Sequence, residues 1–100
     1  MTTRLEHDLL GEREIPANAY WGIHTLRAIE NFPITGVPIG HYRSLVRGLG
    51  FIKEASAKAN LKLGVITQEL AEPIIKASIE VRDGLWDAEF AVDAIQGGAG

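Results

Sequence analysis

The strongest constraint on the fold is a long helical pattern between Tyr42 and Gly64. Apolar residues recur there at spacings of three, four and seven, which predicts an amphipathic α-helix. The predicted apolar stripe is Leu45, Leu49, Ile52, Ala59 and Leu63, and the predicted charged stripe on the opposite side is Arg47, Glu54, Lys58 and Lys62. Phe51 and Leu61 fall among the charges, so we expect this helix to have a second packing partner.

A second helix is predicted from Thr67, a good N-cap residue, to about Asp83, with Gly84 in the position that favours a helix stop. Its apolar arc is unusually broad, so we expect neighbours on two sides. Pro73 lies beyond the first turn and removes a backbone donor, which predicts a kink or a late helix start. The arc contains Leu70, Ile74, Ile75, Ala77, Ile79 and Val81, and the narrow polar strip contains Glu69, Lys76, Glu80 and Asp83.

The rest of the chain predicts smaller elements. Residues 5–10 and 13–15 read as a β-hairpin with Gly11-Glu12 as its turn and Pro16 as its end. A helix is expected from about Ala19 to Asn31, with Asn18 as N-cap. Residues 32–40 read as an ordered connection, and residues 86–95 as an irregular or short-element segment. The fold class is therefore mainly α with a small N-terminal β-hairpin.

Composition narrows the function classes. The 100 residues carry a net charge of −3 and a pI of about 5.5, the wrong sign for a dedicated nucleic-acid-binding protein. The sequence has no cysteine, which excludes a disulfide framework, a thiolate nucleophile and a cysteine zinc site. No stretch approaches the roughly 18 apolar residues of a membrane span, and the first residues are charged rather than apolar. We therefore expect a cytoplasmic protein without a membrane partner.

Few residues offer chemistry on their own. The histidines His7, His24 and His41 lack a second ligand at helical metal spacing, and Glu6-His7-Asp8 is more simply a solvated strand. Arg27 shares a helix face with His24 and offers a planar fork for a carboxylate, although pairing with a structural carboxylate is the simpler interpretation.

The segment Gly97-Gly98-Ala99-Gly100 lets backbone approach an anionic ligand, but a plain glycine-rich turn is the default interpretation. It lacks the Gly-Lys-Ser/Thr ending of a phosphate loop and the spacing of a dinucleotide fingerprint. The residues alone indicate a mainly helical domain and no particular reaction.

Several segments together resemble the N-terminus of the aspartate ammonia-lyases, in the aspartase/fumarase superfamily. The similarity follows the family's order along the whole chain. Gln96-Gly97-Gly98-Ala99-Gly100 and His24-Thr25-Leu26-Arg27-Ala28 resemble aspartases more than class II fumarases, whereas Pro73 departs from the family pattern. The matching segments are Asp8-Leu9-Leu10-Gly11, Ile15-Pro16-Ala17-Asn18-Ala19-Tyr20-Trp21-Gly22, residues 24–32 and residues 90–100.

The resemblance implies reversible elimination of ammonia from L-aspartate to give fumarate, in a homotetramer without a required cofactor or metal. Residues 1–100 would be a partial, N-terminal lyase domain, with the central helical-bundle and C-terminal domains outside this chain. The family's serine base and substrate-holding segments are absent, so no catalytic residue is assigned. Gly97, Gly98 and Gly100 would line the substrate pocket, and Arg27 would act electrostatically or behind the residues that touch substrate.

Two alternatives stay open. A class II fumarase-like or related lyase would use the same fold with another leaving group. A non-catalytic, stand-alone interaction domain would use it without any reaction.

Overall fold

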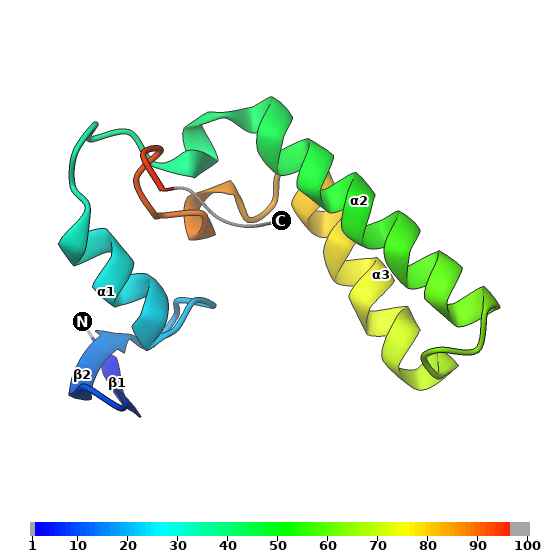
Figure 1. The fold of residues 1–100 in the computed structure, drawn as a ribbon, viewed down its shortest axis with the longest axis horizontal. Helices are drawn as coiled ribbons and strands as arrows, with labels where there is room; N and C mark the ends of the chain where they lie inside the picture. Colours follow the sequence, from blue (N-terminus) through cyan, green and yellow to red (C-terminus); the bar gives the residue numbers. More distant parts are fainter. Residues whose placement is uncertain (1, 97–100) are drawn as a thin grey trace. The chain divides into compact units, whose positions relative to one another are not determined.

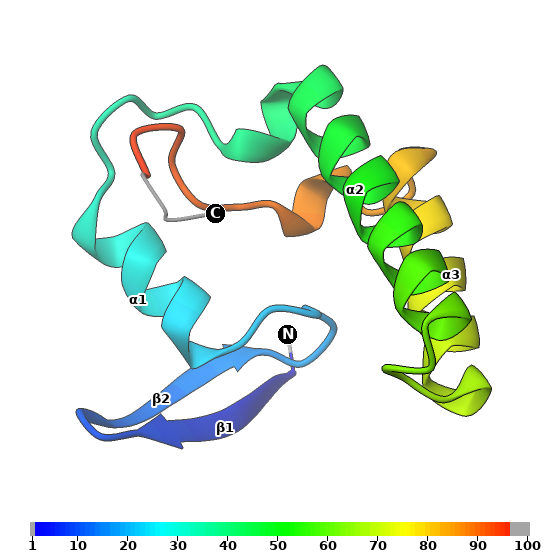
Figure 2. The same cartoon turned by 45° about the vertical axis from the view of Figure 1, so that its right-hand side comes forward.

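The computed structural model describes residues 2–96, which form two compact units (Figures 1 and 2). The N-terminal unit comprises the chain up to Ile39 together with residues from Ala88 onward, and the helical unit is Gly40–Asp87. The expected fold class, mainly α with a small β-hairpin, is confirmed. The elements are β1 (Thr3–Asp8), β2 (Gly11–Pro16), α1 (Ile23–Asn31), the 3-10 helix η1 (Ile39–His41), α2 (Arg43–Lys62), α3 (Gln68–Arg82) and the 3-10 helix η2 (Asp87–Glu89).

The N-terminal hairpin is confirmed, but its turn is not where the sequence predicted it. β1 and β2 are antiparallel, with Asp8 opposite Gly11, so Leu9 and Leu10 form the turn. The Asp8 carboxylate accepts a hydrogen bond from the Leu10 backbone N–H at 2.9 Å, which closes the turn. Gly11 begins β2 with a φ of 128°, a backbone conformation that glycine adopts readily. The glycine therefore follows the turn instead of forming it.

Helix α1 begins at Ile23, four residues later than expected, and Asn18 is not its N-cap. The Arg4 guanidinium is the physical reason, because it binds the carbonyls of Ala19 at 2.6 Å and Trp21 at 2.7 Å and so holds this segment out of a helix. The N-terminus of α1 is capped instead by Glu6, whose carboxylate accepts from the Ile23 N–H at 2.9 Å. A side chain of β1 thus determines where α1 starts.

Helices α2 and α3 lie side by side and run antiparallel, since the chain reverses between Lys62 and Gln68 (Figures 1 and 2). The Thr67 hydroxyl caps α3 by accepting from the Leu70 N–H at 3.3 Å, as the sequence predicted. Gly84 follows α3 with a φ of 92°, which confirms the predicted stop. The late helix start that Pro73 suggested is wrong, because α3 begins at Gln68 and Pro73 lies inside it.

The face of α2 that packs against α3 is not the predicted apolar stripe. The buried residues of α2 are Val46, Gly50, Glu54 and Ala57, and those of α3 are Ala71 and Ser78. Small residues let the two helix backbones approach closely, so the larger apolar side chains are left on the outside. The small size of these residues, and not hydrophobicity alone, determines which face of α2 packs against α3.

Glu54 was expected on an exposed charged stripe, but it is buried against α3. Its carboxylate is paired with the Lys58 ammonium at 2.7 Å and the Arg82 guanidinium at 2.8 Å. Phe51 lies beside this group, with the Arg82 and Arg47 guanidinium carbons 5.1 and 5.5 Å from its ring centroid. A paired charge therefore replaces an apolar side chain at this point of the interface.

The connection after α1, which the sequence predicted to be ordered, pairs with residues 92–94. The Ile39 N–H donates to the Val92 carbonyl and the Ala94 N–H to the Val37 carbonyl, both at 2.8 Å. Pro38 and Asp93 form an isolated antiparallel bridge. Within residues 2–96, no helix has the length and apolar content needed to cross a membrane.

The close helix approach predicts opposite effects for two glycines of α2. A Cβ on Gly50 would lie 2.7 Å from the Arg82 backbone nitrogen and 2.9 Å from its Cα, whereas a Cβ on Gly48 meets nothing within 4 Å. Gly50→Ala should destabilise by about 1–3 kcal/mol because the helices must separate. Gly48→Ala, the matched control, should stabilise by about 0.5–1 kcal/mol. Urea unfolding followed by circular dichroism measures both, and equal effects would contradict the interface described above.

Candidate functional site

A buried carboxylate organises the chain that leads to the glycine-rich segment. Asp93 Oδ1 accepts from the Thr35 hydroxyl and the Ile95 N–H, both at 2.8 Å, and Oδ2 accepts from the Thr35 and Gly36 N–H groups, both at 2.9 Å. The residue is only 7% exposed. Four donors on one carboxylate therefore fix the connection after α1 to the segment that runs to Gln96.

These bonds decide the charge of Asp93. Burial alone disfavours the ionised carboxylate, but the hydrogen bonds from Ile95, Thr35 and Gly36 outweigh it, so the pKa of Asp93 is lowered from its usual value. Asp93 is consequently ionised at neutral pH. A negative charge therefore lies three residues before Gln96, at Asp93, a residue to which sequence patterns assign no function.

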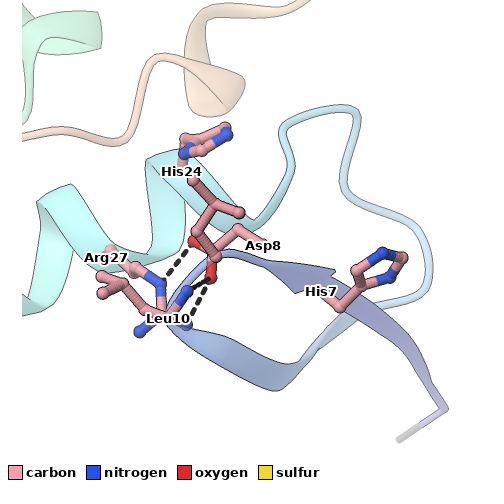
Figure 3. A pocket seen from close by; sticks show the side chains of 6 residues that line it. His7, Asp8, Leu10, His24 and Arg27 are labelled. Atoms are coloured by element: carbon pink, nitrogen blue, oxygen red, sulfur yellow. Dashed lines mark hydrogen bonds and ion pairs between the residues drawn. The ribbon is translucent and has the colours of Figure 1, made fainter.

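A second cluster surrounds an open pocket of about 530 Å³ in the N-terminal unit. Figure 3 shows Asp8 against Arg27, with the His24 side chain near this pair and the His7 side chain apart from it. His7 makes no dashed contact with the Asp8–Arg27 pair (Figure 3). The pocket is lined by His7, Asp8, Leu9, Leu10, His24 and Arg27.

Arg27 is held by two bonds in the plane of its guanidinium. Its Nε donates to Asp8 Oδ2 at 2.7 Å and its Nη2 to Asp8 Oδ1 at 2.9 Å, with side chains 19% and 10% exposed (Figure 3). The Arg27 hydrogen bond is the main cause of a lowered pKa at Asp8, with burial opposing it and the Leu10 N–H adding to it. This is the structural carboxylate that the simpler interpretation of Arg27 anticipated. The pair fastens α1 to the hairpin.

Several expected residues do not join a site. His41 lies in the helical unit, where it makes an edge contact with Tyr42. Gly97, Gly98 and Gly100 lie outside the described residues, so their expected place along a pocket wall stays a prediction. Among residues 2–96, no group of three or more potential His, Cys, Asp or Glu ligands is placed to hold a metal ion.

Sequence patterns did not reveal the structural roles of Arg4, Glu6 and Asp93, whose hydrogen bonds organise the N-terminal unit. Arg4 also pairs with Glu6 at 2.8 Å, and this bond is the main cause of the lowered pKa of Glu6. A partial signal existed for Glu6 and Asp8, because alternate strand residues share one face. Nothing local marks Asp93, whose partner Thr35 is 58 positions away.

The same architecture occurs in a known class of enzymes. The chain is similar to the crystal structure of a fumarate lyase:delta crystallin from Brucella melitensis, with a TM-score of 0.87, 47% identity, and coverage of 99% of this chain and 22% of that one. The fold is therefore that of the N-terminal region of fumarate lyases.

The family is shown directly by sequence. Residues 11–100 match the family model described as Lyase, and the chain belongs to this family. An aspartate ammonia-lyase from a Bacillus species is 50% identical over 97 residues, and so is a class II fumarate hydratase from Halobacterium salinarum. In both cases the match covers 97% of this chain, which spans about 20% of the relative's length.

The four-donor arrangement predicts a specific effect of Asp93→Asn. An amide has one acceptor oxygen, so its NH₂ group would face two donors that the carboxylate now satisfies. We expect hydrogen exchange at the amides that then face the NH₂ group, either Ile95 or both Thr35 and Gly36, to speed up at least about tenfold. Asp83→Asn is the matched control, because the Asp83 side chain is 53% exposed. Unchanged protection in Asp93→Asn would refute the role assigned to the carboxylate.

The ion pair of Asp8 and Arg27 predicts a pH dependence. The folded state lowers the pKa of Asp8 below its usual value of 3.8, so the pair stabilises the fold above that value. Its contribution is lost as the pH falls through the lowered pKa. The melting temperature of Asp8→Asn should therefore lie below that of the unchanged protein at pH 6, and the gap should narrow below about pH 4. A gap that is constant with pH would count against the pair.

Proposed function

We propose that this chain forms the N-terminal region of an aspartate ammonia-lyase, which eliminates ammonia from L-aspartate to give fumarate. The observation that carries the proposal is the aspartase-type segment Gln96-Gly97-Gly98-Ala99-Gly100, in a chain 50% identical over 97 residues to the Bacillus enzyme. Membership of the lyase family supports the reaction class.

The elimination removes a proton from Cβ of L-aspartate and then releases ammonia from Cα, leaving the double bond of fumarate. The carbanion formed at Cβ spreads its charge into the adjacent carboxylate, so donors around that carboxylate stabilise it. We propose that the base and most of these donors belong to segments outside these 100 residues. The chain itself contributes the framework of one pocket wall.

Two features of the described residues fit this framework role. Asp93 ties the segment that precedes the glycines to Thr35 and Gly36, so the wall would start from a fixed position. Glycines 97, 98 and 100 would then let backbone approach the dicarboxylate without a Cβ between them. Arg27, which Asp8 already binds at two atoms, would act through its charge and through its hold on α1, without touching substrate.

The same proposal covers the assembly and setting of the enzyme. We propose a homotetramer in which residues 1–100 are part of the N-terminal domain, with a central helical-bundle domain and a C-terminal domain outside these residues. The reaction as proposed requires no cofactor and no metal. A cytoplasmic location is proposed because the cysteine-free composition suits a reducing compartment.

A class II fumarase activity is the second candidate, because the Halobacterium salinarum fumarate hydratase is also 50% identical over 97 residues. That reaction would interconvert malate and fumarate with water as the leaving group. The segment Gln96–Gly100 favours aspartase, since the fumarases of the family tend to carry Gln-Thr-Gly-Ser-Gly there.

Substrate choice tests the two candidates. The full-length protein should form fumarate from L-aspartate, with release of ammonia, and should form it much more slowly from L-malate. The ultraviolet absorbance of fumarate measures both rates. The 100 residues alone should form none from either substrate, since the proposed base lies elsewhere. Faster conversion of malate would establish the fumarase alternative. Fumarate formation by the 100 residues alone would show that the catalytic groups had been placed wrongly, and no activity with either substrate in the full-length protein would favour a non-catalytic interaction domain.

A further inference from the structure

The outer surface of α2 carries a continuous apolar stripe that α3 does not cover. Its large members are Leu45, Leu49, Ile52 and Leu63, with exposed fractions of 51, 37, 60 and 76%. Ser56 and Ala59, both exposed, complete the stripe. The spacings from residue 45 to 63 alternate between four and three, the repeat of a helix that packs lengthwise against another helix.

Helix α3 has a similar stripe. Leu70 and Ile74 are 57 and 44% exposed, and Ala77 and Val81 continue the same spacing. Successive residues of an α-helix are rotated by about 100° around the helix axis. Each stripe is therefore rotated around its own helix by about a quarter to two fifths of a turn from the residues that contact the other helix. Because the helices are antiparallel, both rotations lead to the same side of the pair. The two stripes thus form one apolar face, which we call the outer face.

Charge limits what can cover the outer face. The charged residues at the positions that flank the α2 stripe are Lys53 and Lys62, both exposed, and no acidic residue of α2 occupies a flanking position. If a second copy packed its own α2 here, lysine-bearing flanks would meet lysine-bearing flanks. A helix with acidic residues beside its apolar stripe is a better match.

Length indicates where such a helix comes from. α2 has 20 residues, so a lengthwise partner needs a helix of about 30 Å. The chain spans about 20% of the length of its relatives, and the other four fifths of such a polypeptide are available to supply the helix. Large contiguous apolar patches on soluble proteins mark interaction sites.

We propose that the outer face of α2 and α3 docks an amphipathic helix with acidic flanks, supplied by the rest of the same lyase polypeptide. This inference rests on the proposed function only for the source of that helix. In the assembled enzyme, Leu49, Ile52 and their neighbours are then buried, and the helical unit is held by packing that the 100 residues lack.

Photo-crosslinking in the full-length protein tests this assignment. A photoreactive amino acid replaces either Ile52, on the stripe, or Arg47, an exposed residue on the opposite side of α2. We expect several-fold more crosslinking from position 52, to a peptide from outside residues 1–100 that has an apolar heptad pattern with acidic flanks. Equal crosslinking at both positions, or crosslinks to a second copy of α2 or α3, or to an unrelated protein, would overturn the proposal.

A pair of glutamate variants gives an independent measurement. Ile52→Glu should lower the urea midpoint of the full-length protein more than Arg47→Glu does, because it buries a charge beneath the docked helix. The same midpoint shift in both variants would contradict docking. Neither measurement uses turnover, so a protein that docks this helix without converting L-aspartate would leave the inference intact and reject only the proposed function.

Discussion

The close approach of α2 to α3 at Gly50 is the constraint on which the helical unit depends. The Arg82 backbone occupies the space that a Cβ at this position would need, so the helices meet along their small residues. Gly50, Ala57, Ala71 and Ser78 all lie on the contact. Because the small residues of each helix face the other helix, its leucines and isoleucines lie on another side, where they can contact a different neighbour. An isolated pair would be expected to bury the large residues first.

The N-terminal unit is organised differently, by charged side chains that bind backbone. Its buried apolar residues among those described are Ile15 and Ile23. Arg4 donates hydrogen bonds to backbone carbonyls after β2, and Glu6 caps α1. Asp93 accepts hydrogen bonds from four donors. Each of these groups satisfies polar backbone atoms that no helix or sheet satisfies at that point. Such bonds fix local geometry more sharply than apolar contact does, which suits a segment that leads into the proposed substrate pocket.

Sequence patterns predicted the elements formed by local rules. The 42–64 helix, the Thr67 cap and the Gly84 stop follow from periodicity and from backbone preferences that a few neighbouring residues determine. The start of α1 did not follow, because its cap comes from Glu6, 17 positions earlier. The buried face of α2 was also missed, since hydrophobicity points to Leu49 while the interface is set by the absence of a side chain at Gly50. Arg27 lies between these cases: its guanidinium suggested a carboxylate partner, but only the fold identifies Asp8.

The two kinds of organisation suit different tasks in one lyase. Hydrogen bonds to a buried carboxylate have narrow distance and angle requirements, so Asp93 can hold the approach to the glycines in one conformation. An apolar face has no such directional requirement and gains free energy with the area that it covers. The helical unit can therefore anchor this region to a larger body without dictating its detailed geometry. The charged contacts of the N-terminal unit can then define the proposed pocket wall independently of how strongly the proposed docked helix binds.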